Sequence, residues 1–118
     1  MANDRTTASL AANSKLADDL VLIDDLVQAR RIVLRALAQH RAKVYLYGSV
    51  AKGSAGRTSD IDIAVLPEEP LPQGTLATMR QEIEESNIPY PIELVDLRKV
   101  DEIFRERVVR EGILWSAP

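Results

Sequence analysis

Apolar residues recur at helical spacing along the first third of the chain. This spacing predicts one long helix over residues 14–41, after a stretch of small and polar residues, 1–13, that we expect to be a flexible tail. The positions that carry the pattern are Leu16, Leu20, Ile23, Val27, Leu34 and Leu37, widened by Leu22, Leu26, Ala29 and Val33. Aspartates, among them Asp24 and Asp25, gather in the first half and arginines in the second, which suits the helix dipole and predicts a solvated charged face.

The remainder of the chain alternates short strands with helices. Strands are predicted at 44–47, 61–66 and 92–97, helices at 75–86 and 100–111, and a short edge strand at 113–115. Gly112 is well placed to stop the last helix. This order predicts an α/β (α+β) fold, a small mixed β-sheet with helices packed on one face. We expect residues 14–118 to form a single domain.

Composition excludes several classes of protein. The chain of 118 residues has no cysteine, which excludes a disulfide scaffold, a thiolate metal site and a cysteine nucleophile. Its net charge of −3, with scattered basic residues, argues against a broad nucleic-acid surface. No apolar run has membrane-spanning length, so we expect a cytoplasmic protein without a membrane partner. His40, the only histidine, is expected to be structural.

Two carboxylates stand out in the middle of the chain. Asp60 and Asp62 lie two residues apart at the predicted strand 61–66, so their side chains leave the same face. Carboxylates this close repel each other, and burying them is unfavourable unless a cation compensates. Oxygen ligands with open positions suit Mg²⁺ or Mn²⁺. An exposed pair on an edge strand is the alternative.

A loop of small residues precedes these carboxylates. Gly48 and Ser49 directly follow the predicted strand 44–47, and a glycine permits close backbone approach and positive φ. The Ser49 hydroxyl and nearby N–H groups suit phosphate oxygens, and a short helix beginning here would add a favourable field. Lys52 and Arg57 are candidates to neutralise phosphate charge. An ordinary turn with solvated cations is the alternative, and the spacing excludes a Walker-type loop.

The loop and the carboxylates are close enough in sequence to meet. Ten residues separate Ser49 from Asp60, enough for the chain to turn back and place the two strands side by side. The Gly-Ser start, Gly53 and the Ser-Asp-Ile-Asp sequence ending at Asp62 resemble the signature of the DNA polymerase β-type nucleotidyltransferase superfamily. The nearest match is its minimal nucleotidyltransferase branch. The resemblance covers about residues 32–115.

The resemblance implies a third carboxylate on a later strand, between apolar residues. Asp96 matches that description and is the residue we expect to join Asp60 and Asp62. Glu93 is the rival on the same predicted strand, and alternation puts it on the opposite face from Asp96. An aspartate that caps a turn at the end of the strand is the remaining alternative.

The resemblance also implies a mechanism. Divalent metal ions that bridge a nucleoside triphosphate would be held by the catalytic carboxylates Asp60, Asp62 and Asp96. The phosphates would be contacted by Gly48, Ser49 and Lys52. The implied reaction moves a nucleoside monophosphate, expected to be AMP from ATP, onto a hydroxyl and releases pyrophosphate.

Partners follow from the same resemblance. Members of the minimal branch pair with a HEPN-domain protein, often as prokaryotic toxin–antitoxin modules in which the nucleotidyltransferase is the antitoxin and adds AMP to the toxin. A catalytically weak or inactive nucleotide-binding antitoxin that acts by complex formation is one alternative. A small-molecule, aminoglycoside-type nucleotidyltransferase is another. The apolar stripe of the first helix fits a partner contact or core packing equally, and a homo-oligomer stays open.

Overall fold

The computed structural model describes residues 22–53 and 60–116. Residues 22–36 form an amino-terminal helix. The elements that follow are β1 (Ala42–Tyr47), α2 (Gly48–Ala51), β2 (Ile61–Pro67), α3 (Thr75–Glu85), β3 (Ile92–Asp96), α4 (Glu102–Glu111) and β4 (Ile113–Leu114). This order confirms the predicted alternation. The predicted tail 1–13 and the first part of the predicted helix lie outside the described residues.

The four strands form one mixed sheet in the order β3-β2-β1-β4. β2 runs antiparallel to β1 and parallel to β3, and β4 pairs antiparallel with β1. The predicted small mixed sheet is therefore confirmed. Because β2 has a neighbour on both sides, Asp62 does not lie on an edge strand.

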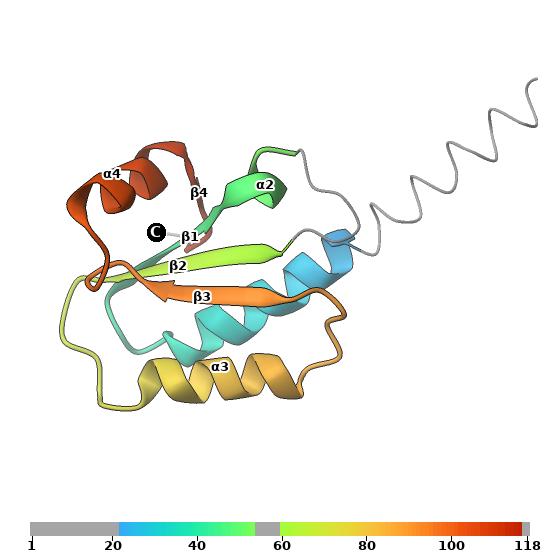
Figure 1. The fold of residues 1–118 in the computed structure, drawn as a ribbon. Coiled ribbons are helices and arrows are strands. Elements are labelled where there is room, and N and C mark those ends of the chain that lie inside the picture. Colours follow the sequence, from blue (N-terminus) through green and yellow to red (C-terminus); the bar gives the residue numbers. More distant parts are fainter. Residues whose placement is uncertain (1–21, 54–59, 117–118) are drawn as a thin grey trace, which may run out of the picture.

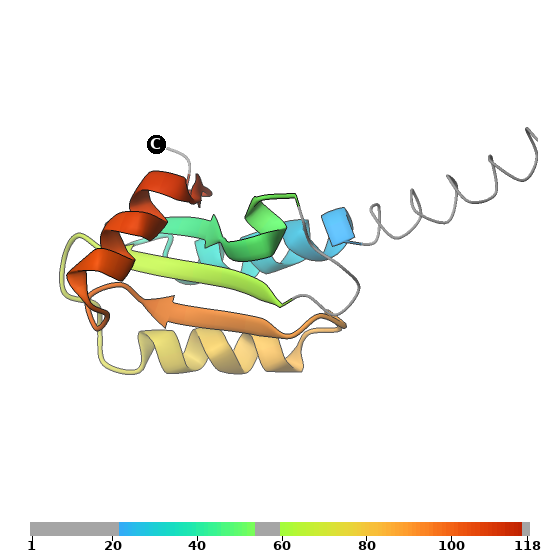
Figure 2. The same ribbon diagram turned by 45° about the horizontal axis from the view of Figure 1, so that its top comes forward.

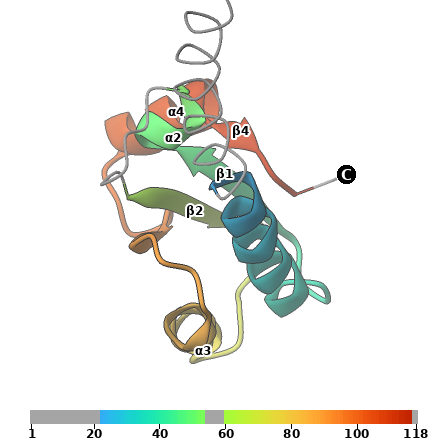
Figure 3. The same cartoon turned by 90° about the vertical axis from the view of Figure 1, so that its right-hand side faces the viewer.

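The larger core lies on one face of the sheet. Ile63 and Val65 of β2 are fully buried there with Val33 of the amino-terminal helix and Met79 of α3. Figures 1 and 3 show both helices on this side of the sheet. Strand alternation places every second residue of β2 in this core, so the residues between them, Asp62 among these, face the other way.

The opposite face is covered only in part, by α4. Tyr45 and Ala64 of the sheet are buried there against Val108 of α4 and Leu97. Figure 2 shows α4 and α2 above the sheet and α3 below it. The expectation that all helices pack on one face is therefore wrong in this detail. Both faces of β1 are covered, since the consecutive residues Val44, Tyr45 and Leu46 are all buried.

The amino-terminal helix ends earlier than predicted, and a different face of it is buried. It ends at residue 36, and a turn follows at 37–39. Its buried stripe includes Ala29 and Val33, whereas Ile23 and Val27 are 54% and 50% exposed. Asp25, predicted to lie on a solvated face, is buried with no hydrogen-bond partner for Oδ2 among the described residues.

The carboxyl-terminal segment closes the sheet and anchors the first helix. Gly112 is the C-cap of α4, as predicted, and its φ of −73° is an ordinary value. A Cβ at Gly112 would lie 2.6 Å from the Val108 carbonyl oxygen, so lack of space explains this glycine. The Trp115 N–H donates to Val44, and the Trp115 carbonyl accepts from Arg30 of the amino-terminal helix. Among the described residues, no helix combines the length and apolarity required to cross a membrane.

Candidate active site

The carboxylates meet where β1, β2 and β3 run side by side. The register pairs Tyr47 with Asp62 across β1 and β2, and Asp62 with Glu93 across β2 and β3. Residues that pair in register share a face, so these three side chains form a row on the face that α4 covers in part. The structure therefore brings a carboxylate of β3 beside Asp62, and that carboxylate is Glu93.

The charge on Asp62 is crowded. Burial raises its pKa, and the negative charges of Glu93 and Asp60, with a hydrogen bond that protonated Asp62 donates to Glu93, raise it further. The pKa of Tyr47 rises to about 12 through burial and through Asp62 and Glu93. Carboxylates this close repel each other when both are charged, and a cation bound beside them would relieve that repulsion. The electrostatics of this row favour a bound cation.

Asp60 lies next to the row of Tyr47, Asp62 and Glu93. It lies immediately before β2 and is exposed, and its negative charge is near enough to raise the pKa of Asp62. Within the described ranges no three acidic or histidine side chains already converge as a preformed metal cluster. The oxygen-only donor set of Asp60, Asp62 and Glu93 nevertheless fits a hard divalent cation, provided that the exposed Asp60 turns toward the other two.

Asp96 is not part of this site, which corrects our expectation. It pairs in register with Val65, so it faces the large core, and it is only 5% exposed. Its Oδ1 accepts hydrogen bonds from the Arg98 backbone and Nε, and Oδ2 accepts from Nη2 at 2.9 Å. Burial by itself raises the pKa of Asp96, but these bonds outweigh it and the net pKa is lowered. Through these bonds to Arg98, Asp96 stabilises the turn after β3. This role is close to the turn-capping aspartate that the sequence offered as an alternative.

Gly48 holds the loop directly against Asp62. It has φ +78°, and a Cβ placed there would clash with Oδ2 of Asp62. The next residue, Ser49, lies in α2, which has four residues and is too short for a helix-dipole argument. Lys52 is the C-cap of α2. Arg57, the other candidate cation, lies outside the described residues.

Replacing Gly48 by alanine is expected to destabilise the fold and impair the site. The positive φ alone disfavours alanine by about 1–2 kcal/mol, and the new methyl group must displace the carboxylate of Asp62. Gly53→Ala is the matched control, because Gly53 has φ +72° but no described atom lies within 4 Å of the place its Cβ would take. Urea unfolding should give a larger loss for Gly48→Ala than for Gly53→Ala; equal losses would remove the role assigned to the Asp62 contact.

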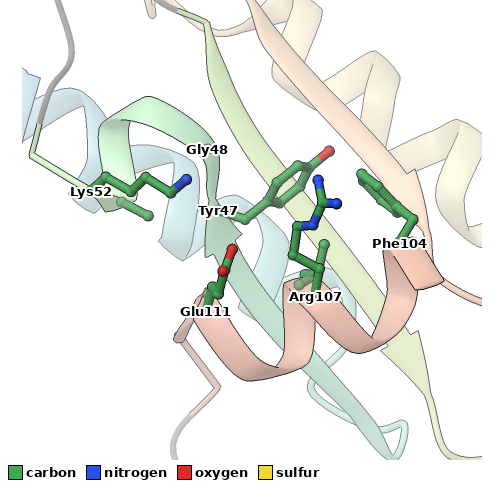
Figure 4. A pocket seen from close by; sticks show the side chains of 9 residues that line it. Tyr47, Gly48, Lys52, Phe104, Arg107 and Glu111 are labelled. Carbon is green, nitrogen blue, oxygen red and sulfur yellow. The ribbon is translucent and has the colours of Figure 1, made fainter. Parts of the chain in front are cut away.

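Two hollows adjoin the row, separated by an aromatic pair. Tyr47 and Phe104 contact edge to face, with ring centroids 5.8 Å apart and an interplanar angle of 87°. A groove of about 620 Å³ lies on one side and is lined by Asp62, Glu93 and Lys99 as well as by the two rings. A smaller cavity of about 170 Å³ lies between α2 and α4 (Figure 4). Tyr47 and Phe104 line both hollows.

The sequence contained a pattern of apolar residues that could have identified Glu93. Asp62 stands between Ile61 and Ile63, and Glu93 stands between Ile92 and Leu94. Asp96 also stands between apolar residues, Val95 and Leu97, so this pattern alone does not separate the two acids of β3, and the face that each acid shares decides. Asp96 shares its face with Ile92 and Leu94, which belong to the large core or pack against it.

The fold and the site together define a class of protein. The glycine-serine turn between β1 and β2, the acids Asp60 and Asp62 at the start of β2, and Glu93 on the parallel strand β3 lie at the same end of the sheet. Residues 33–116 match the family model described as polymerase beta, nucleotidyltransferase, and the chain belongs to this family.

Individual relatives support the same assignment. The chain is 36% identical over 74 residues to protein adenylyltransferase MntA of Shewanella oneidensis, a match that covers 62% of this chain and 52% of that protein. It superposes with TM-score 0.61 and 33% identity on a solved structure described as a minimal nucleotidyltransferase, covering 76% of this chain and 92% of that one. A toxin–antitoxin structure with AMP-PNP gives TM-score 0.59, 28% identity and coverage of 75% and 73%. The chain spans about half the length of the curated relatives it matches.

Proposed function

We propose that this chain is a metal-dependent adenylyltransferase that moves AMP from ATP to a hydroxyl group of a partner protein. The observation that carries the proposal is the row of Asp62 and Glu93 across parallel strands, with Asp60 next to it. Crowding carboxylates on one face raises the energy of the empty site, and a protein that served only as a scaffold would gain nothing from it. We place this activity in the cytoplasm, where ATP is available.

Asp60, Asp62 and Glu93 would hold Mg²⁺, or Mn²⁺ in its place, which neutralises the triphosphate and stabilises the developing charge at phosphorus. Gly48 lets the phosphates approach the carboxylates, and Ser49 and Lys52 lie on the same turn to contact them. The acceptor oxygen forms a bond to the α-phosphorus while the bond to the β-phosphate oxygen breaks. Pyrophosphate leaves with the bonding electrons, and the hydroxyl proton passes to a carboxylate of the row and on to solvent.

The partner we propose is a HEPN-domain toxin, with this chain as the antitoxin. The MntA adenylyltransferase of S. oneidensis and the toxin–antitoxin structure with AMP-PNP support this proposal. The exposure of Ile23 and Val27 on the amino-terminal helix supports a contact beyond the domain's own core. The acceptor hydroxyl then belongs to the partner.

Labelled ATP provides the test. We expect the protein, incubated with ATP labelled in the α-phosphate and with Mg²⁺, to transfer label to the protein encoded beside it. Transfer should stop when EDTA removes the metal and resume when Mg²⁺ is restored. A parallel reaction with ATP labelled in the γ-phosphate should leave the partner unlabelled, because the γ-phosphate departs with pyrophosphate.

Each contrary result has a distinct meaning. Tight complex formation without label transfer in any metal would overturn the enzymatic proposal and favour an antitoxin that acts by binding alone. Label from the γ-phosphate on the partner would indicate a kinase and contradict nucleotidyl transfer. Transfer to an aminoglycoside instead of the partner would favour a small-molecule acceptor.

A further inference from the structure

The cavity between α2 and α4 lies beside the carboxylate row but outside it. It is lined by Tyr47 and Gly48 at the end of β1, Lys52 at the end of α2, and Arg107 and Glu111 of α4. On α4, Arg107 lies three residues after Phe104 and Glu111 three after Val108, so helical spacing directs all four toward the sheet side. Figure 4 shows the charged ends of Lys52, Arg107 and Glu111 gathered around Tyr47.

Two cations of this cavity have no partner within residues 22–53 and 60–116. In the part of the chain that the structure describes, neither the Lys52 nor the Arg107 side chain takes part in a hydrogen bond or an ion pair, although the Lys52 backbone N–H donates to the Gly48 carbonyl. Among the described residues that line the cavity, Glu111 is the single acid, and it already lies 4.0 Å from the guanidinium of Arg110. The lining therefore has an excess of positive charge, which attracts an anion. Arg107 adds a planar fork of donors suited to two phosphate oxygens at once.

Gly48 connects this cavity to the carboxylates. It lines the cavity, and its Cα hydrogens face Oδ2 of Asp62 with no side chain between them. A polyphosphate in the cavity could therefore continue past Gly48 to the groove, with the bond between two phosphates lying near Asp62. No larger side chain at position 48 would leave this passage open.

The size of the cavity indicates which part of a nucleotide it accepts. Its volume of about 170 Å³ is below the roughly 300–1,000 Å³ of pockets that enclose whole small molecules. The groove on the far side of Tyr47 and Phe104, at about 620 Å³, falls within that range. The cavity thus suits phosphates, and the groove suits the bulkier nucleoside or the acceptor.

We infer that Arg107 and Lys52 form the subsite for the β- and γ-phosphates, and that this cavity holds the pyrophosphate when it leaves. The inference rests on the proposed function and extends it to a residue of α4. The two cations neutralise charge that appears on the leaving group as the bond to the α-phosphorus breaks, so Arg107 contributes to binding and to the reaction.

Calorimetric titration with Mg²⁺–ATP, Mg²⁺–pyrophosphate and AMP separates the subsites. Arg107→Ala should weaken binding of ATP and of pyrophosphate at least tenfold and change AMP binding less than twofold. Arg107→Lys should fall between wild type and alanine, because it keeps the charge and loses the fork. Arg105→Ala is the matched control, at an arginine of the same helix that lies outside the cavity lining and forms no ion pair with the described residues, and should behave as wild type. Glu111→Gln removes the acid and should tighten pyrophosphate binding.

The outcomes distinguish this inference from the function on which it rests. If wild type binds and transfers AMP but Arg107→Ala matches Arg105→Ala with all three ligands, the subsite is wrong and the proposed function stands. Equal weakening of AMP and ATP would place Arg107 near the nucleoside and also overturn the assignment. If wild type binds neither ATP nor pyrophosphate, the proposed function falls, and the subsite falls with it.

Discussion

Replacing Asp62 by asparagine is expected to lower AMP transfer by more than about 100-fold, beyond the range typical of residues that only support a metal ligand. Asparagine keeps the size of the side chain but removes the charge that a divalent cation requires. The measurement is the initial rate of label transfer from ATP at saturating Mg²⁺. Glu84→Gln, at an exposed acid of α3 that forms no ion pair with the described residues, serves as the control and should retain full activity.

The same variant is expected to be more stable than wild type in the absence of metal. Asp62 is half-buried beside Glu93 and Asp60, so at neutral pH its charge opposes folding. Solvent screening at a half-buried site limits the gain to about 1 kcal/mol, which corresponds to a rise in Tm of about 3–6 °C for a chain of this size.

The pH dependence of this gain follows from the raised pKa of Asp62. A pKa raised in the folded state means that the folded protein holds the proton more tightly than the unfolded chain, whose aspartates titrate near 3.8. Wild type is therefore favoured below that pH and loses this contribution as the pH rises through the folded pKa. The advantage of Asp62→Asn should grow over the same interval. A variant that is less stable than wild type at pH 7 without metal would contradict the crowding of charge at Asp62.

Most of the fold was predictable because its determinants are local. Short β-prone runs bounded by glycine or proline identified the three longer strands, and the loop between β1 and β2 carried enough fixed residue types to indicate the family. Gly48 and Asp62 were singled out together, and the structure brings them into direct contact. The predictions about the site that were wrong concern features that depend on the relation between elements.

Asp96 and Glu93 show why. The sequence places them on opposite faces of one strand, and the structure agrees. Which face carries the chemistry depends on how β3 lies against β2 and which helix covers each side, and neither is fixed by spacing within β3. Arg107 was missed for the same reason, since its place beside Lys52 depends on how α4 crosses the sheet. The error on Ile23 and Val27 likewise concerns the rotation of a helix about its axis.

Replacing the two acids of β3 gives the second large expected effect, because one replacement should lower activity and the other should lower stability. Glu93→Gln should lower AMP transfer by more than about 100-fold with little loss of stability, since it removes a charge beside Asp62. Asp96→Asn should leave the rate per folded molecule within about twofold. It should instead destabilise the fold by about 1–3 kcal/mol, the usual effect of weakening hydrogen bonds to a buried charged group. Transfer rates and urea unfolding of both variants measure the contrast.

The lowered pKa of Asp96 predicts a pH dependence of stability that is specific to the Asp96 variant. An acid whose pKa falls on folding contributes stability above its unfolded pKa, near 3.8, and loses it as the pH falls through the folded value. The stability difference between wild type and Asp96→Asn should therefore be full at neutral pH and shrink below about pH 3.8. A rate loss in Asp96→Asn as large as that in Glu93→Gln, in protein shown to be folded, would restore Asp96 to the site. Since β3 presents Glu93 and not Asp96 to the face of Asp62, we expect the chemistry to follow the register of the strands.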